Sequence, residues 1–102
     1  MNRVILINTL TVKAERIDEF VAAQREFSSA MRGRANGLLG GRLYRSTDGR
    51  KAVLVSHFES PEAQQAMLRS PEFQAHLTRM REMVESSSPS NYVEAYSHGD
   101  FQ

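Results

Sequence analysis

The chain has 102 residues, of which 40% are hydrophobic and 25% charged, enough for a single domain that buries its own core. Lys and Arg number 13 against 12 Asp and Glu, and this near-neutral balance argues against a nucleic-acid-binding protein, because such proteins are strongly basic. Cysteine is absent, which excludes disulfides, thiolate metal sites and cysteine nucleophiles. The longest apolar run, at 4–7, is too short for a membrane span or a secretion signal, so we expect a cytoplasmic protein.

The first third of the chain predicts a strand followed by an amphipathic helix. Val4–Leu10 is rich in β-branched and leucine residues, as strands are. From Ala14 the apolar residues recur at helical spacing opposite a charged face, and the predicted helix ends between Gly33 and Gly37. Its apolar stripe consists of Ile17, Phe20, Val21, Phe27 and Met31.

The middle of the chain predicts a β-hairpin. Residues 38–45 and 51–59 have the composition of strands, and the segment Ser46-Thr47-Asp48-Gly49 between them is typical of a turn. Gly40 and Gly41 indicate a bulge or a close backbone approach early in the first of these strands. They do not form a phosphate-binding loop, because the Lys-Ser/Thr ending of such loops is missing.

Two identical tripeptides, Ser60-Pro61-Glu62 and Ser70-Pro71-Glu72, each predict the start of a helix. Serine caps the free amides, proline suits the first helical position, and glutamate favours the positive end of the helix dipole. We expect a short helix to about Arg69 and a longer one to about Glu85. The apolar face of the longer helix consists of Phe73, Leu77, Met80 and Val84.

The end of the chain predicts a loop over Ser86–Ser90, a last strand over Tyr92–Tyr96 and a polar tail at 97–102. The resulting order is β-α-β-β-α-α-β. With the split helix counted once, this is the ferredoxin-like split βαβ pattern, an α+β fold with helices on one face of an antiparallel sheet. We expect residues 1–102 to form one domain, since no linker separates a second one.

Two strands also predict a partner. Neither Val4–Ile7 nor Ala52–Val55 alternates apolar with polar residues, so both faces of these strands are expected to be buried. The helices can cover one face only. A second copy packed sheet to sheet would cover the other, giving a two-fold homodimer. The alternative is that a loop or the C-terminal tail folds over it.

The sequence resembles the antibiotic biosynthesis monooxygenase family over nearly its whole length. The resemblance is carried by Asn8-Thr9-Leu10-Thr11-Val12, by Gly37-Leu38-Leu39-Gly40, by Val53-Leu54-Val55-Ser56-His57-Phe58-Glu59-Ser60 and by Leu68-Arg69-Ser70-Pro71-Glu72-Phe73. It implies a dimeric α/β barrel with a cavity between sheet and helices in each protomer. Family members include cofactor-free oxygenases of polycyclic phenols or quinols, haem-degrading proteins, and proteins with no known reaction.

The resemblance implies roles for single positions of this chain. Asn8 matches the distal asparagine of haem-degrading relatives, and Phe58 stands where the family usually has tryptophan. Met67 stands where relatives often have histidine or tryptophan, and Leu54 where some oxygenases have a substrate-activating asparagine. His76 precedes by one residue the position of the haem ligand in haem-degrading relatives, a shift of about 100° around a helix, which argues against haem degradation.

Asn8 and His76 are the two candidate catalytic residues. Asn8 is a polar residue on the face of Val4, Leu6 and Leu10, where its amide could orient a substrate oxygen or dioxygen, or simply bond a nearby backbone group. His76, on the flank of the last helix, could accept a phenolic proton or be a half-buried histidine with no chemical role. The resemblance also implies a substrate-binding cavity, with methionine and phenylalanine suited to flat rings; at helical and strand spacing such residues are equally compatible with an ordinary core. The residues expected to line it are Leu6, Leu54, Phe58, Met67, Phe73 and Met80.

The other histidines have no predicted role. His57 alternates away from Phe58 and is expected under a helix or at the subunit contact, and His98 in the polar tail is expected to be solvated. The three histidines lack metal-ligand spacing, so we expect no metal. A basic patch on the hairpin, including Arg42 and Arg45, is interpreted as a solvated rim.

These observations favour one functional hypothesis and leave another open. The first is a homodimeric monooxygenase that acts on an aromatic or quinol-like small molecule in an apolar cavity, without metal or organic cofactor and without a nucleic-acid or membrane partner. The alternative is a non-catalytic dimer that binds a small apolar ligand in the same cavity, or no ligand at all.

Overall fold

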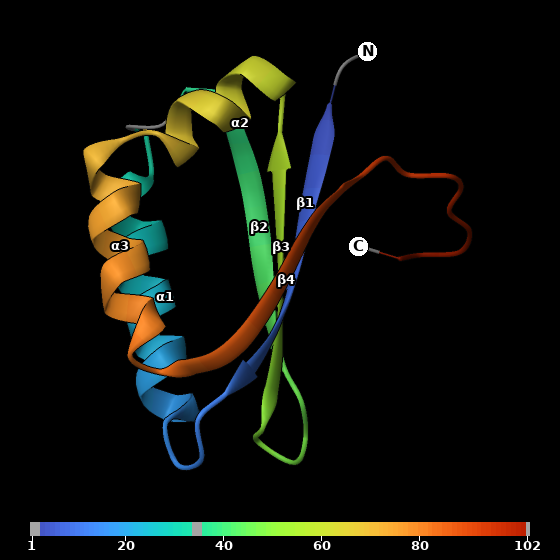
Figure 1. Cartoon of the computed structure of the whole chain (residues 1–102). Helices are drawn as coiled ribbons and strands as arrows, with labels where there is room; N and C mark the ends of the chain where they lie inside the picture. The colour runs from blue at the N-terminus through green and yellow to red at the C-terminus, as the bar shows by residue number, and fades with distance from the viewer. Residues whose placement is uncertain (1–2, 34–35, 102) are drawn as a thin grey trace.

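The computed structural model describes residues 3–33 and 36–101, and within them the four strands form one antiparallel sheet in the order β2-β3-β1-β4 (Figure 1). Helices α1 and α3 cover one face of this sheet, and α2 lies at one end. The predicted ferredoxin-like α+β fold is confirmed. The elements are β1 (Val4–Val12), α1 (Ile17–Met31), β2 (Leu38–Arg45), β3 (Lys51–Phe58), α2 (Pro61–Leu68), α3 (Pro71–Arg81) and β4 (Val84–Tyr92).

Helix α1 begins three residues later than its hydrophobic period suggests. The chain turns first, because Glu15 adopts a left-handed conformation with φ 64° and the Arg16 N–H donates to the Lys13 carbonyl at 3.0 Å. The helix ends at Met31, before the expected glycine stop at 33–37, a segment whose residues 34–35 lie outside the described chain. The predicted stripe lies on the sheet side, with Ile17 and Phe20 buried.

Helices α2 and α3 begin where the repeated tripeptide predicts. The Ser60 hydroxyl accepts the Ala63 N–H at 3.1 Å, and the Ser70 hydroxyl accepts the Phe73 N–H at 3.2 Å. Helix α3 is shorter than expected and ends at Arg81, not near Glu85. It ends there because the chain turns at residues 82–83 and then joins the sheet.

Strand β4 contradicts the predicted end of the chain. Ser86–Ser90 was expected to be a loop and Tyr92–Tyr96 a strand; instead Val84–Tyr92 is the strand, and it pairs with β1 from Ile5 to Val12. Serine has little preference for strands, so pairing with β1 decides the outcome. Pro89, which lacks an N–H, is tolerated because β4 is an edge strand.

The β2–β3 hairpin is confirmed, with Gly49 at φ 76° in the turn and its N–H donating to Ser46 at 3.0 Å. The two glycines at the start of β2 have the predicted roles. The pairing register shifts between Leu38 and Gly40, as in a bulge, and a Cβ on Gly41 would lie 2.5 Å from the Val55 carbonyl oxygen. Only glycine allows β2 to approach β3 this closely.

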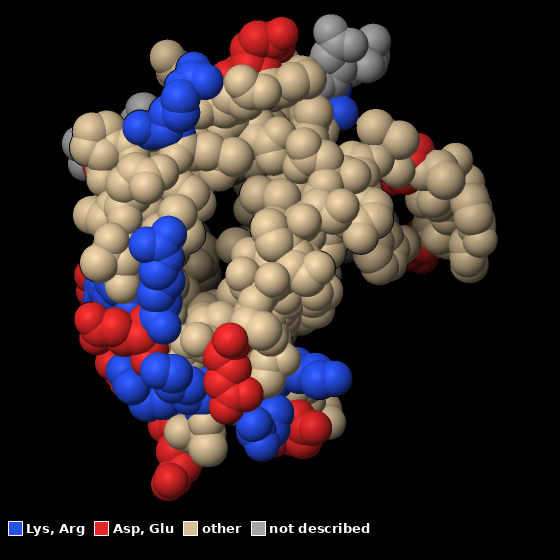
Figure 2. Space-filling view, in the orientation of Figure 1, with Lys and Arg blue, Asp and Glu red and all other residues tan. Residues whose placement is uncertain are grey.

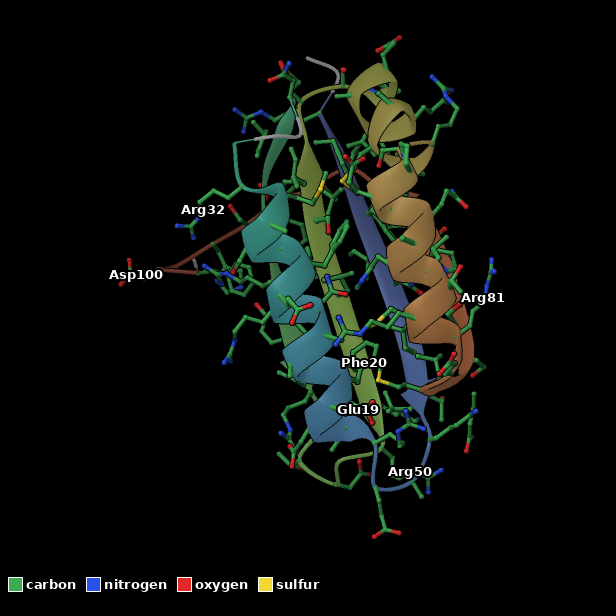
Figure 3. All side chains as sticks on the ribbon, turned by 90° about the vertical axis from the view of Figure 1, so that its left-hand side faces the viewer. Glu19, Phe20, Arg32, Arg50, Arg81 and Asp100 are labelled. Carbon is green, nitrogen blue, oxygen red and sulfur yellow. The ribbon has the colours of Figure 1, made fainter. Side chains whose placement is uncertain are left out.

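The hydrophobic core is concentrated at one end of the two layers. Phe20 points from α1 into the space between the helices and the sheet (Figure 3). Around it lie the other buried residues of the core, Val12, Ile17, Ala23, Ala52, Met80 and Met83. At the opposite end Val4 and Phe58, paired across β1 and β3, are also buried. Between these packed ends, the middle of the sheet is less completely covered.

The sheet has an inner face towards the helices and an outer face that no helix of the described residues covers. By strand alternation the outer face carries Ile5, Ile7, Val53 and Val55, all half-buried, and the half-exposed Tyr44 and Tyr92. Residues 93–101, here called the C-terminal arm, leave the sheet on the side away from the helices (Figure 1). Among the described helices, none is both long and apolar enough to span a membrane.

Candidate functional site

The space between the helices and the middle of the sheet is the best candidate for a binding site. The molecular surface is hollowed between the two layers (Figure 2). A cavity of about 380 Å³, here called the α1–β2 pocket, enters this space between α1 and the strands β2 and β3. Leu54 and Gln24 line it, and Asn8 is the cross-strand neighbour of Leu54 on the inner face. Its volume lies in the lower range of small-molecule sites.

His76 is held on the helix side of this space by groups from α1. Its Nε2 lies 3.0 Å from the Oε1 of Gln24, and its ring stacks on Phe27 with centroids 4.1 Å apart and planes at 12°. Phe73 adds a third ring, 6.3 Å from His76. The pairs 24/27 and 73/76 have three-residue spacing, which places both members of each pair on one helix face. We call Gln24, Phe27, Phe73 and His76 the His76 cluster.

The environment of His76 keeps its imidazole neutral. Only 9% of the residue is exposed, and burial, with a smaller contribution from the positive charge of Arg79, lowers the pKa of His76 from 6.5 to about 4. With the Gln24 oxygen facing Nε2, that nitrogen carries the ring proton and Nδ1 keeps its lone pair. A histidine in this state presents a free lone pair at neutral pH but is a weaker base than an ordinary imidazole, so an oxyanion formed beside it is needed to stabilise its protonated form.

Asn8 presents a hydrogen-bond donor on the inner face of the sheet. Its Oδ1 accepts the Ser88 backbone N–H of β4 at 3.1 Å. This bond orients the amide, so the other atom, Nδ2, is the donor, and no acceptor among the described residues bonds it. Asn8 was expected either to orient a substrate oxygen or to bond a nearby backbone group. Its oxygen makes the backbone bond, and its nitrogen remains free to bind a ligand oxygen.

The remaining predicted lining residues fall into two groups. Leu6, Leu54, Met67 and Phe73 are half-buried, in positions where they retain surface for a ligand. Phe58 is completely buried at one packed end, and Met80 belongs to the core at the other end. The structure thus brings Asn8 beside Leu54, and Phe73 beside His76.

Sequence analysis missed Gln24, the hydrogen-bond partner of His76. Gln24 is only 7% exposed and lies on the same helix face as Phe20 and Ile17, four and seven residues earlier. A polar residue within an apolar stripe was the signal that could have identified it. A second buried glutamine, Gln64 of α2, exchanges two amide hydrogen bonds of 2.8 and 3.0 Å with Asn91 and so ties α2 to β4.

The other two histidines lie outside this site. His57 is exposed on the outer face, so of its two predicted positions the one under a helix is wrong, because the helices are on the other side of the sheet. The other, at a subunit contact, stays a prediction. His98 is exposed in the C-terminal arm, as predicted, with its ring 6.3 Å from that of Tyr96. In the described part of the chain, no group of three His, Cys, Asp or Glu side chains is placed to hold a metal ion.

Comparison with known proteins identifies the family. Residues 3–79 match the family described as antibiotic biosynthesis monooxygenase. The protein belongs to this family. A search of curated proteins finds no match to the sequence.

Solved structures share the fold. SnoaB of Streptomyces nogalater, described as a cofactor-independent oxygenase, superposes with a TM-score of 0.84 at 21% identity, over 95% of this chain and 97% of its own. Rv0793 of Mycobacterium tuberculosis superposes with a TM-score of 0.81 at 17% identity, over 96% of this chain and 100% of its own. SO0527 of Shewanella oneidensis reaches 0.79 at 22% identity, over 89% of each chain. At these identities the likeness establishes the fold alone.

Proposed function

We propose that this family member is a cofactor-independent monooxygenase that acts on an aromatic or quinol-like small molecule between the helices and the sheet. The observation that carries the proposal is the buried, neutral His76, stacked on Phe27 and held by Gln24, a residue that also lines the α1–β2 pocket. The same fold supports cofactor-independent oxygenation in SnoaB.

The proposed chemistry needs a base and a water-poor environment. His76 Nδ1 takes a proton from the phenolic or quinol-like substrate, and Asn8 Nδ2 donates a hydrogen bond to the resulting oxyanion. The electron-rich phenolate then reduces dioxygen: one oxygen atom bonds to the ring carbon para to the oxyanion, which carries one hydrogen, and His76 returns its proton to the peroxide so formed. The hydroperoxide loses water, made from its OH group and the hydrogen of that carbon, to leave a ketone. Both electron pairs come from the substrate, so dioxygen is the only co-reactant.

Oxygen uptake with a panel of hydroxynaphthacenes and quinols, in the presence of a chelator, tests this function. We expect turnover above the blank, a loss of at least about a hundredfold in kcat for His76→Gln, and unchanged turnover for the matched control His98→Gln. Absence of uptake across the panel would contradict the proposal.

One observation favours the alternative of a non-catalytic ligand-binding protein. The oxygen of Asn8 is already bonded to β4, and no hydrogen bond joins Asn8 to the His76 cluster within the described residues. If this alternative holds, aromatic ligands bind to the parent protein without any oxygen uptake. If the oxygenase holds, Asn8→Ala keeps ligand affinity and lowers turnover.

We propose that the protein forms a homodimer in which the outer faces of the two sheets pack against each other. Ile7 and Val55, paired at the centre of the sheet, leave apolar surface there that none of the described helices covers. The C-terminal arm does not hide its own apolar side chains, since Val93, Tyr96 and Phe101 are 76–81% exposed. A second copy gives both surfaces a partner.

Light scattering of the purified protein measures this state. We expect a particle of twice 11.5 kDa at micromolar concentration and, for Val55→Lys on the outer face, an 11.5 kDa monomer. Glu85→Lys is a control on the edge strand that keeps the dimer. A parent protein of 11.5 kDa would refute the packing.

A further inference from the structure

The α1–β2 pocket has an apolar floor that extends the candidate site towards the hairpin. Val21 of α1, Leu43 of β2 and Leu54 of β3 line it. Gly41, which has no side chain, also lines it. The pocket, of about 380 Å³, thus offers apolar side chains from three elements to a small ligand.

The charged residues that line this pocket are all positive. They are Arg25, Arg42 and Arg45, but strand alternation puts the Arg42 side chain on the outer face with Tyr44, so Arg25 and Arg45 are the two that can face the pocket. No Asp or Glu of the described residues lines it. Arg45 is paired with Asp18 at 2.8 Å, and an Arg42 Nη1 lies 3.5 Å from the Tyr44 hydroxyl. Arg25 forms no ion pair with another described residue. Its guanidinium is therefore available to an anion at the pocket.

The opening between α1 and α3 differs in charge. It is a smaller cavity of about 270 Å³, beside His76, lined by Glu26 and Glu72 with Arg79, and Arg79 is already paired with Glu26 at 2.8 Å. A negatively charged ligand is disfavoured there and favoured at the α1–β2 pocket. The two cavities therefore differ in the charges that line them.

We infer that the α1–β2 pocket binds aromatic carboxylates, with the ring on Val21, Leu43 and Leu54 and the carboxylate at Arg25. A guanidinium binds a carboxylate through charge-assisted, often bidentate hydrogen bonds. Gln24, which lines the pocket and bonds His76, lies between the ring and the proposed base. That an aromatic carboxylate is the substrate rests on the proposed function. That the pocket binds an aromatic carboxylate does not.

Titration with 2-naphthoate and its neutral isostere 2-naphthamide, followed by calorimetry and by backbone NMR shifts, tests the inference without turnover. We expect 2-naphthoate to bind roughly tenfold more tightly than 2-naphthamide, with shift changes at Ser28 and Leu43. In Arg25→Gln, an exposed position, the two affinities should become equal. Arg81→Gln removes the same charge on the side of α3 turned away from α1 (Figure 3) and should keep the tenfold preference.

Three outcomes would overturn the inference: no binding of 2-naphthoate, equal affinity for the acid and the amide, or an equal loss in Arg25→Gln and Arg81→Gln. The last would mean that overall charge, not the pocket, attracts the ligand. Failure of the proposed function can be told apart from failure of this inference. If the protein prefers 2-naphthoate through Arg25 but consumes no oxygen with any phenol or quinol, the pocket binds the carboxylate and the protein is not an oxygenase.

Discussion

Burial of His76 makes the stability of the protein depend on pH in a defined range. In the unfolded chain this imidazole takes up a proton near 6.5, whereas burial and Arg79 lower its pKa in the folded protein to about 4. Between these values the unfolded state binds more protons, so folding stability falls as the pH decreases from about 6.5 to about 4. Above 6.5 the histidine is neutral in both states and contributes no pH dependence.

The size of the effect follows from the same two values. A pKa shift from 6.5 to about 4 corresponds to a total loss of folding stability of about 3 kcal/mol at low pH. At pH 4.5 about 2.5 kcal/mol of this stability has already been lost. His76→Gln keeps an amide donor for the Gln24 oxygen but cannot be protonated, so the variant should lack this part of the pH dependence.

Urea denaturation at pH 7, 6, 5 and 4.5, at one fixed protein concentration, measures the difference. The free energy of unfolding should fall by about 2.5 kcal/mol more for the parent than for His76→Gln. Glu26 and Glu72, which line the cavity beside His76, are present in both proteins, so the comparison isolates the contribution of the histidine. His98→Gln, at an exposed site, should behave as the parent. Parallel curves for parent and His76→Gln, or an NMR titration of His76 near 6.5, would refute the reasoning.

Three further changes test the fold by the same denaturation assay at pH 7. Ser60→Ala removes the oxygen that accepts the Ala63 N–H and should lower stability by about 1 kcal/mol, whereas Ser60→Asp, which restores an acceptor, should lose much less. Gly41→Ala places a Cβ against the Val55 carbonyl oxygen and should destabilise by about 1–3 kcal/mol; a neutral effect would mean that β2 moves away freely. Phe58→Ala empties a fully buried site and should lower stability by about 3–5 kcal/mol, and a loss below 1 kcal/mol would show that this end is loosely packed.

Much of the candidate site was accessible from the pattern of residues. Asn8 was recognised because it is polar within an apolar strand, and His76 because it lies on the flank of the apolar face of a predicted helix, whereas Phe73 was assigned to the cavity from the family resemblance. Gln24 was not recognised, since glutamine on a helix gives no sign of its partner until α1 and α3 are packed together. Arg25 and Arg45, which line the α1–β2 pocket, come from α1 and β2, which are distant in sequence.

The sequence by itself determined the elements whose signals are local. Ser-Pro-Glu starts two helices through hydrogen bonds within one turn, and the Ser46–Gly49 turn joins neighbouring strands, so both could be predicted without the rest of the chain. Only the tertiary structure decided that Val84–Tyr92 is a strand, because its serines and Pro89 form one by bonding to β1, nearly eighty residues earlier. It also decided the state of His76, whose lowered pKa arises from burial between α1 and α3, a property that belongs to the packed helices and not to either helix alone.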